Sequence, residues 1–300
     1  MKFEEIKMLN FKQASFNDKQ NFGNHIVNYC KENGFLILKD SYVSIEQQKN
    51  LFALADHFFK NITKEIREEI KYNKSTNRGL ASIGAEALDE NSIDIKETYN
   101  IGFEGTSVPN LLTKNPDFQE FNKAFLEYAE TCYLNIQDLL RGLALGCNME
   151  EEFFVNKHNR NSQTLRLLHY PVVKDTKEKY AVSPHTDYGS LTMVLQDSGA
   201  TLSVQDLKTQ EWHDIKAEVG CAIINIGDLL MRWSNDVLQS NPHKADYKSG
   251  EKSSYMSAFF AHPSYDETIS CLPAFKGEQE LYEPINSLDY LNMRIANTYK

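Results

Sequence analysis

The pattern of apolar residues changes after Gln163, and this change constrains the fold more than any other feature of the chain. Before Gln163 apolar residues recur mainly at helical spacing, whereas beyond it short apolar runs are separated by turn residues. Repeated short runs of this kind are typical of antiparallel strands. The expected strands are 164–170, 191–196, 201–206, 211–215, 222–226, 243–247, 255–262 and 268–271. The second half of the chain is therefore predicted to form an antiparallel sheet or barrel.

The first 160 residues are predicted to be mainly helical. Helical spacing of apolar residues predicts helices at 16–33, from Ser44 onward, at 117–145 and, near the C-terminus, at 287–299. Residues 35–40 are expected to form a short buried strand. With no linker and no internal repeat, we expect a single domain over residues 1–300. Its parts are a helical N-terminal region (1–160), a β core carrying the functional residues (161–275) and a C-terminal helix (276–300).

Composition and charge exclude several classes of protein. A net charge of -10 and a pI near 5.4 argue against a nucleic-acid-binding protein, which normally carries a basic face. The five cysteines are scattered without a C-x-x-C pair, so neither a disulfide framework nor a thiolate zinc site is expected. The first residues do not resemble a signal peptide, and no apolar stretch is long enough to span a membrane. We therefore expect a cytoplasmic protein that binds neither nucleic acid nor membranes.

A His-x-Asp pair, His185 and Asp187, precedes one expected strand, and His243 begins a later one. Two imidazoles and one carboxylate are the ligand set of a facial iron(II) site with open positions. On an extended strand, residues two apart point to the same face, so this pair could reach one ion together. The alternative is a surface histidine followed by a turn residue, because such pairs also arise by chance. His262 is the rival third ligand, and its placement makes it second to His243.

Six ordered segments make the chain resemble a known family. They are ENGFL (32–36), DIKETYNIG (94–102), LRLLHYP (165–171), HTDYGSLT (185–192), NIGDLLMRWSN (225–235) and NPHK (241–244). Together they are similar to the isopenicillin N synthase-like family of iron(II)- and 2-oxoglutarate-dependent dioxygenases. The resemblance implies a mainly β fold with helices, in which a double-stranded β-helix (jelly roll) core carries a packed helical N-terminal region. This agrees with the change of pattern at Gln163.

The resemblance also implies a function and a set of site residues. His185, Asp187 and His243 would be the iron(II) ligands, 2-oxoglutarate the co-substrate, and ascorbate a possible reductant. The reaction would be oxidation of a small molecule by dioxygen, through hydroxylation, desaturation or ring closure. Tyr170 is a candidate for hydrogen bonding to the co-substrate, and Arg166 on the same strand face could offer a cation to a carboxylate.

The chain departs from the family pattern where the co-substrate is held. Family members bind the distal carboxylate of 2-oxoglutarate with an Arg-x-Ser pair, and here Ser254 and Met256 occupy those positions. Three accounts remain open. Another cation could substitute, with Lys252, Arg232 and Arg166 as candidates; the enzyme could be an iron oxidase that does not use 2-oxoglutarate; or the barrel could bind a small molecule without turnover. A zinc enzyme using the same three ligands is a further alternative.

Substrate identity is not readable from these residues. In the family, segments equivalent to 78–84 and 96–99 and the C-terminal helix contact substrate or close the pocket. The aromatic residues Tyr99, Phe103, Phe259 and Phe260 could wall a pocket but are expected in the core, with Phe260 the more buried of the last two. Gly227 and Asp228 are expected to turn the chain.

Overall fold

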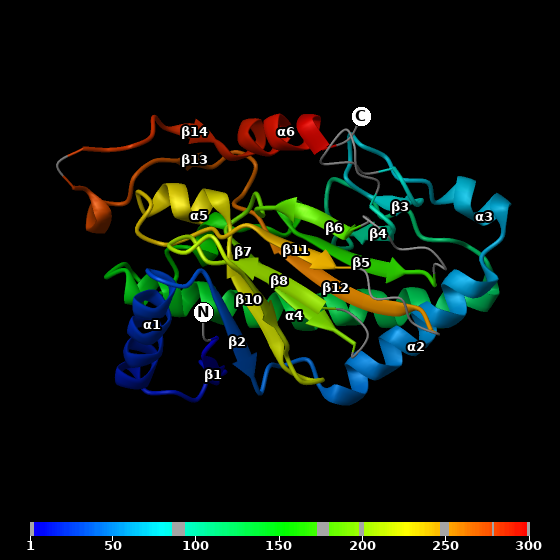
Figure 1. The fold of residues 1–300 in the computed structure, drawn as a ribbon, viewed down its shortest axis with the longest axis horizontal. Helices are drawn as coiled ribbons and strands as arrows, with labels where there is room; N and C mark the ends of the chain where they lie inside the picture. Colours follow the sequence, from blue (N-terminus) through cyan, green and yellow to red (C-terminus); the bar gives the residue numbers. More distant parts are fainter. Residues whose placement is uncertain are drawn as a thin grey trace.

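Two β-sheets form the centre of the protein (Figure 1). The structure is a computed structural model that describes residues 3–85, 94–172, 180–197, 201–246, 252–277 and 279–298. The larger sheet has the strand order β1 (Glu5–Lys7), β2 (Phe35–Lys39), β10 (Ala222–Ile226), β7 (Leu191–Gln196), β12 (Ser254–Ala261), β5 (Thr164–Tyr170), β4 (Glu97–Ile101) and β3 (Gly79–Ala81). The smaller sheet has the order β6 (Tyr180–His185), β11 (His243–Asp246), β8 (Thr201–Gln205) and β9 (Trp212–Ile215). Two short strands, β13 (Thr268–Ile269) and β14 (Ile285–Asn286), pair separately.

The two sheets enclose an apolar interior. Residues from both sheets pack into one buried cluster, including Leu168 and Met256 from the larger sheet and Leu202 and Ala245 from the smaller. Strand pairing is antiparallel throughout these sheets except for β1 with β2. This arrangement is a jelly roll, so the expected mainly β fold with helices is confirmed.

Helices cover the outer face of the larger sheet. On this face α4 (Gln119–Gly146) lies against the sheet, and α1 (Phe16–Cys30) and α2 (Ile45–Asn61) pack against α4. The remaining helices are α3 (Lys64–Glu69), α5 (Asp228–Trp233) and α6 (Ser287–Thr298). Ser15, Ser44 and Thr63 start the first three helices, each by accepting a backbone N–H with its side-chain oxygen. Figure 1 shows α4 running behind the larger sheet and α6 lying along the top of the molecule.

The long helix α4 joins the helical layer to the sheet. The Tyr128 hydroxyl contacts the Ser257 hydroxyl of β12 at 2.8 Å in a buried position. On its other side α4 packs against α1 at Gly23, where a Cβ atom would lie 2.1 Å from the backbone oxygen of Gly142. A glycine is therefore required for the close approach of these two helices. No described helix combines the length and apolarity that a membrane crossing requires.

Most predicted elements are confirmed, with boundaries that differ by a few residues at most of their ends. Tyr247 and Tyr299, expected at the ends of a strand and a helix, lie outside the described residues. The N-terminal region contributes four strands, β1 to β4, as well as helices. At Gly227 and Asp228 the chain passes from β10 into α5, whose first residue is Asp228. Strand β6 and helix α3 were not predicted.

The prediction that Phe260 is more buried than Phe259 is wrong. Phe259 is completely buried beneath the helical layer, whereas Phe260 is partly exposed and faces the interior of the jelly roll. Both faces of β12 are covered, one by α4 and one by the interior of the barrel. Alternation along the strand therefore does not distinguish them.

Candidate metal centre

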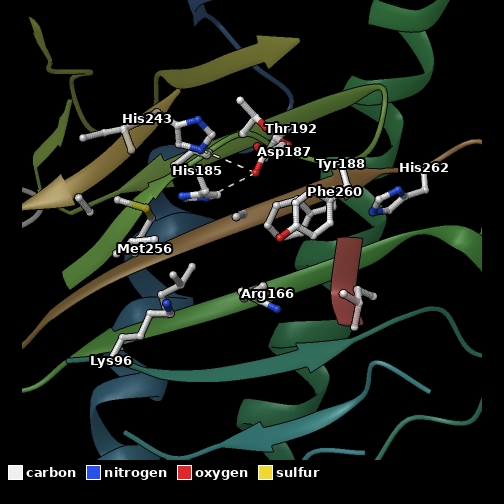
Figure 2. Close-up of a pocket in the computed structure, with 18 of the residues that line it drawn as sticks. Lys96, Arg166, His185, Asp187, Tyr188, Thr192, His243, Met256, Phe260 and His262 are labelled. Atoms are coloured by element: carbon white, nitrogen blue, oxygen red, sulfur yellow. Dashed lines mark ion pairs between the residues drawn. The ribbon is translucent and has the colours of Figure 1, made fainter. Parts of the chain in front are cut away.

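Three side chains converge at one mouth of the jelly roll (Figure 2). His185 ends β6, His243 begins β11, and the register pairs these two residues directly across the smaller sheet. Asp187 reaches them from the loop that follows β6. Possible ligand atoms of the three residues lie within 4.8 Å of one another. The Nε2 atoms of His185 and His243 are each 3.7 Å from Oδ1 of Asp187.

The convergence has a different cause from the one expected. Strand β6 ends at His185, so Asp187 does not share a strand face with it. Instead the loop is bent and anchored: the Asp187 carbonyl accepts the backbone N–H of Asp228 at 2.8 Å. The Asp187 carboxylate is fixed by Asn225 on β10, whose side-chain amide donates to Oδ2 at 2.8 Å. Tertiary hydrogen bonds, rather than strand periodicity, place the carboxylate.

The hydrogen bonds of the two rings define where their lone pairs point. Nδ1 of His185 donates to the Ser183 carbonyl at 2.8 Å, and Nδ1 of His243 donates to the Asn241 carbonyl at 3.3 Å. A ring nitrogen facing a carbonyl oxygen carries the hydrogen, so a ring in its neutral form presents a lone pair at Nε2. Two nitrogen lone pairs and a carboxylate oxygen thus face one another. Such a group of acceptors fits a divalent metal ion.

The protonation states suit the same interpretation. Burial lowers the pKa of His185 to about 4, with His243 and the positive charge of Lys96 acting in the same direction and Asp187 opposing them. Burial raises the pKa of Asp187, but His243, His185 and hydrogen bonds from Thr192 and Asn225 outweigh it and hold that pKa below its usual value. At neutral pH, His185 is therefore a neutral imidazole and Asp187 a carboxylate, the forms that bind metals.

A pocket extends from the three residues into the interior between the sheets. Its wall includes the triad and neighbours from both sheets and α6: Asn77, Lys96, Arg166, Leu168, Val182, Thr186, Tyr188, Thr192, Val194, Leu202, Ala245, Met256, Ala258, Phe260, His262, Leu291 and Ile295. His262 lines this pocket outside the group of three. Its Nδ1 is buried and has no hydrogen-bond partner among the described residues.

Of the other predicted site residues, Arg166 lies at the pocket, and Tyr170 and two of the candidate cations do not line it. Arg166 lines the pocket, and its Nε donates to Asn100 at 3.0 Å. Tyr170 is buried with its hydroxyl 3.8 Å from the sulfur of Met256, and it is not among the described lining residues. Of the cations considered as substitutes, Lys252 is exposed, and Arg232 on α5 donates to the Glu283 carbonyl, away from the pocket.

Lys96 and Asp94 had no individual role assigned from the sequence. Lys96 lines the pocket and donates to Asp94 at 2.5 Å, and both side chains are buried. The available signal was the spacing of Asp94 and Lys96 ahead of a strand, and Lys96 also begins the segment 96–99 that was expected to contact substrate. Arg78, in the other such segment, is fully buried and bonds Thr164 and the Gln163 carbonyl, which is a structural role.

A jelly roll with two imidazoles and one carboxylate at its mouth is the architecture of non-haem iron(II) oxygenases. Comparison with known proteins identifies the family. The profile of the 2OG-Fe(II) oxygenase superfamily matches residues 160–263, and that of the non-haem dioxygenase N-terminal region, named from morphine synthesis, matches residues 6–124. The 2-oxoglutarate-Fe(II) type oxidoreductase hxnY of Emericella nidulans is 32% identical over 289 residues, covering 90% of this chain and 82% of the relative.

Solved structures agree with this identification. A full-length Neurospora crassa protein in complex with alpha-KG superimposes with a TM-score of 0.88 at 28% identity, covering 97% of this chain and 95% of that one. The chain therefore belongs to the 2-oxoglutarate–iron(II) oxygenase superfamily. It is an iron(II)- and 2-oxoglutarate-dependent oxygenase that oxidises a small molecule with dioxygen. Of the accounts left open by the sequence, this supports use of 2-oxoglutarate despite the missing Arg-x-Ser pair.

Proposed function

We propose that His185, Asp187 and His243 hold the catalytic iron(II). The supporting observation is that three acceptors, two Nε2 atoms and one carboxylate oxygen, face one another with their remaining atoms engaged by the protein. Iron(II), when bound, supplies the activation of dioxygen, with 2-oxoglutarate as the source of electrons. The protein orients the ligands through Ser183, Asn241 and Asn225 and surrounds the reacting centre with an apolar interior that limits water.

Iron titration tests this assignment directly. Purified protein is titrated anaerobically with iron(II) by calorimetry, with His185→Ala as the variant and His213→Ala as the matched control. His213 lies on β9 and is not among the described lining residues. We expect the control to bind one iron(II) with wild-type affinity. The iron(II) affinity of His185→Ala should fall at least about 10-fold. Wild-type iron affinity in His185→Ala would disprove the assignment.

We further propose that the oxidised substrate is a small, planar, polar heterocycle. Tyr188 and Phe260 offer aromatic surface on the side of the pocket that also holds Arg166 and His262 (Figure 2). Asn100 orients the Arg166 guanidinium, which also lies 5.6 Å from the centre of the Phe260 ring. The buried Nδ1 of His262 can bond a polar atom of the substrate.

Two relatives suggest different substrates, and the charges of the pocket discriminate between them. The Neurospora crassa protein has also been solved with alpha-KG and thymine, and that structure superimposes with a TM-score of 0.87 at 26% identity over 98% of this chain and 96% of that one. Proline hydroxylase buaE of Petromyces alliaceus is 29% identical over 323 residues, covering 100% of both chains. Among the described lining residues Asp187 is the single carboxylate, so none remains for the ammonium group of an amino acid. This favours a pyrimidine-like ring.

Substrate-dependent oxygen uptake tests the proposal. The iron-loaded protein is given 2-oxoglutarate with thymine, uracil, 5-formyluracil or L-proline, and products are identified by mass spectrometry. We expect turnover with at least one pyrimidine and a raised KM for it in Arg166→Met. Turnover of L-proline without turnover of any pyrimidine would overturn the proposal.

We also propose that residues 1–300 act as one domain in the cytoplasm, with ascorbate as a reductant. Support for one domain comes from a single buried cluster that includes residues of α1, α2 and α4 together with β7, β10 and β12. Urea unfolding followed by circular dichroism and by tryptophan fluorescence should then give coincident transitions.

A further inference from the structure

The wall where the family holds the distal carboxylate of 2-oxoglutarate carries no cation on its own strand. Met256 faces the pocket, and the described lining residues from the two strands that pair with β12 include the apolar Leu168 on β5 and Val194 on β7. Ser254, at the family's arginine position, pairs with Tyr170 across β12 and β5. A carboxylate placed among such residues without a cation would be strongly disfavoured. A co-substrate with two carboxylates therefore needs a positive charge from elsewhere in the pocket.

Lys96 lies in the right row of the sheet to supply that charge. Met256 pairs with Leu168, which pairs with Thr98 on β4, so these three positions form one row across three strands. The row that starts from Ser254 and Tyr170 continues, by the same register, to Lys96 just ahead of β4. Because residues two apart on a strand share a face, Lys96 points into the interior as Thr98 does. Lys96 therefore lies in the same row as Ser254, the family's arginine position, but two strands away from it.

The close-up agrees with this placement. Figure 2 shows Lys96 on the same side of the pocket as Met256, with His185 and His243 above them. Arg166, the other described lysine or arginine of the lining, lies toward Phe260 and His262. It pairs with Ala258 rather than with the Ser254 row. Arg166 is thus placed on the side assigned above to the oxidised substrate.

Asp94 positions the ammonium group relative to the metal centre. Oδ2 of Asp94 accepts from Lys96, and Oδ1 accepts the backbone N–H of Ser183 at 3.0 Å and its hydroxyl at 2.6 Å. The Ser183 carbonyl in turn holds Nδ1 of His185. The ammonium group of Lys96 is thus held at the pocket wall by the Asp94 carboxylate. A buried ion pair contributes little net stability, so its position at a pocket wall is better explained by ligand binding.

We infer that Lys96, positioned by Asp94, binds the distal carboxylate of 2-oxoglutarate in place of the family's arginine and serine. The inference rests on the proposed iron site, which holds the other end of the co-substrate. Lysine presents a compact charge where arginine would present a planar fork. The chain therefore recognises the same carboxylate from a different strand.

Anaerobic titration of the iron(II)-loaded full-length protein tests the inference. Binding of a 2-oxo acid is followed by its visible charge-transfer band, using 2-oxoglutarate and 2-oxopentanoate, which has the same chain length but no distal carboxylate. In Lys96→Met we expect the Kd for 2-oxoglutarate to rise at least about 30-fold, as for loss of a buried charge partner. The Kd for 2-oxopentanoate should stay within about 3-fold, because it does not use the cation.

Three further variants sharpen the result. Lys252→Met is the matched control and should bind both acids like the wild type, and Arg166→Met should keep its preference for 2-oxoglutarate. Adding Ser254→Arg and Met256→Ser to Lys96→Met should recover at least about 10-fold in affinity for 2-oxoglutarate, because the new guanidinium restores a charge-assisted bond. If Lys96→Met does not fold, Lys96→Arg is used instead. We then expect a changed Kd for 2-oxoglutarate and an unchanged Kd for 2-oxopentanoate.

The outcomes separate this inference from the proposed iron site. Unchanged 2-oxoglutarate affinity in Lys96→Met, or in Lys96→Arg if that variant is used, overturns the assignment of Lys96 while the iron site stands. If Arg166→Met loses the preference for 2-oxoglutarate over 2-oxopentanoate and Lys96→Met keeps it, the distal carboxylate is assigned to Arg166 and the inference is overturned. If the wild-type protein does not bind iron, the iron site fails and this inference fails with it.

Discussion

At the scale of single residues, the geometry of the candidate metal centre depends on Asn225. This side chain is buried, and its amide donates to the Asp187 carboxylate from the neighbouring strand β10. Asp187 itself lies in a loop, where strand pairing does not hold it. Residues that orient metal ligands in this way commonly affect affinity almost as strongly as the ligands themselves.

We therefore expect Asn225→Ala to lower iron(II) affinity by about 10- to 100-fold while the protein still folds. The loss arises because the carboxylate becomes free to rotate away from the two imidazoles. Calorimetric titration with iron(II) measures it. Asn61→Ala, an exposed asparagine on α2, is the control and should bind as the wild type does. Equal affinity in the two variants would show that Asn225 does not orient the ligand.

At the scale of elements, close packing of α1 on α4 makes the helical layer sensitive to one methyl group. Gly23→Ala would place its Cβ against the backbone of α4, where neither side chain nor rotamer can adjust. Overpacking of this kind costs about 1–3 kcal/mol, so we expect a corresponding fall in the free energy of unfolding. Urea denaturation measures it. Gly277→Ala, where a Cβ would meet nothing within 4 Å, should change stability little.

The C-terminal helix α6 joins the pocket wall to the loop between the candidate ligands. Leu291 and Ile295 line the pocket, while Arg294 forms an ion pair with the buried Asp228 and donates to Thr186 at 3.1 Å. Asp228 also accepts from Ser240 at 2.8 Å. The helix is thus fixed to the metal-site loop by its charged residue, and its apolar residues close the pocket.

Replacing Arg294 with Met should loosen this closure. We expect the KM for the oxidised substrate to rise several-fold and the free energy of unfolding to fall by about 1–2 kcal/mol, less than for a fully buried pair because Arg294 is partly exposed. Iron affinity should stay unchanged. Steady-state kinetics and iron titration measure these effects together. The control is Met293→Ala on the exposed side of α6, and a wild-type KM in Arg294→Met would contradict the proposed closure.

At the scale of the whole molecule, buried histidines make stability depend on pH. Burial lowers the pKa of His158 to about 4, and the ring is held between the Phe154 carbonyl and the Ser190 hydroxyl. In the unfolded chain the same group has a pKa of about 6.5. Unfolding therefore takes up a proton between these values, so stability is greatest above pH 6.5 and decreases as the pH falls toward 4.

The expected contribution of His158 is a loss of about 2 kcal/mol between pH 7.5 and pH 5. His158→Gln should retain hydrogen bonding without the titration, so its unfolding free energy should change by about 2 kcal/mol less over this range. Urea denaturation at the two pH values measures the difference. His25→Gln reports the effect of removing an exposed imidazole. Identical pH dependence in wild type and His158→Gln would contradict the prediction.

Much of the fold could be predicted from residue patterns because its strands and long helices bury regular apolar faces. Strands β5, β7 and β10 were predicted with their observed bounds, and the start of α2 followed from Ser44. Strand β6 was missed because its apolar run stops after three residues, Tyr180 to Val182, and Pro184 follows within the strand. The orientation of Phe260 was mispredicted because both faces of β12 are covered, so the alternation carries no information on direction.

Residue types and spacing along the chain were enough to predict the jelly-roll fold, the two histidines and the aspartate available for a metal, and the absence of the usual arginine and serine at 254 and 256. The position of Asp187 beside the two histidines, and that of Lys96 on the pocket wall two strands from Ser254, became visible in the folded chain. The physical reason is that residue types and local periodicity are encoded along the chain. A site assembled across strands depends on sheet register and on hydrogen bonds between distant segments.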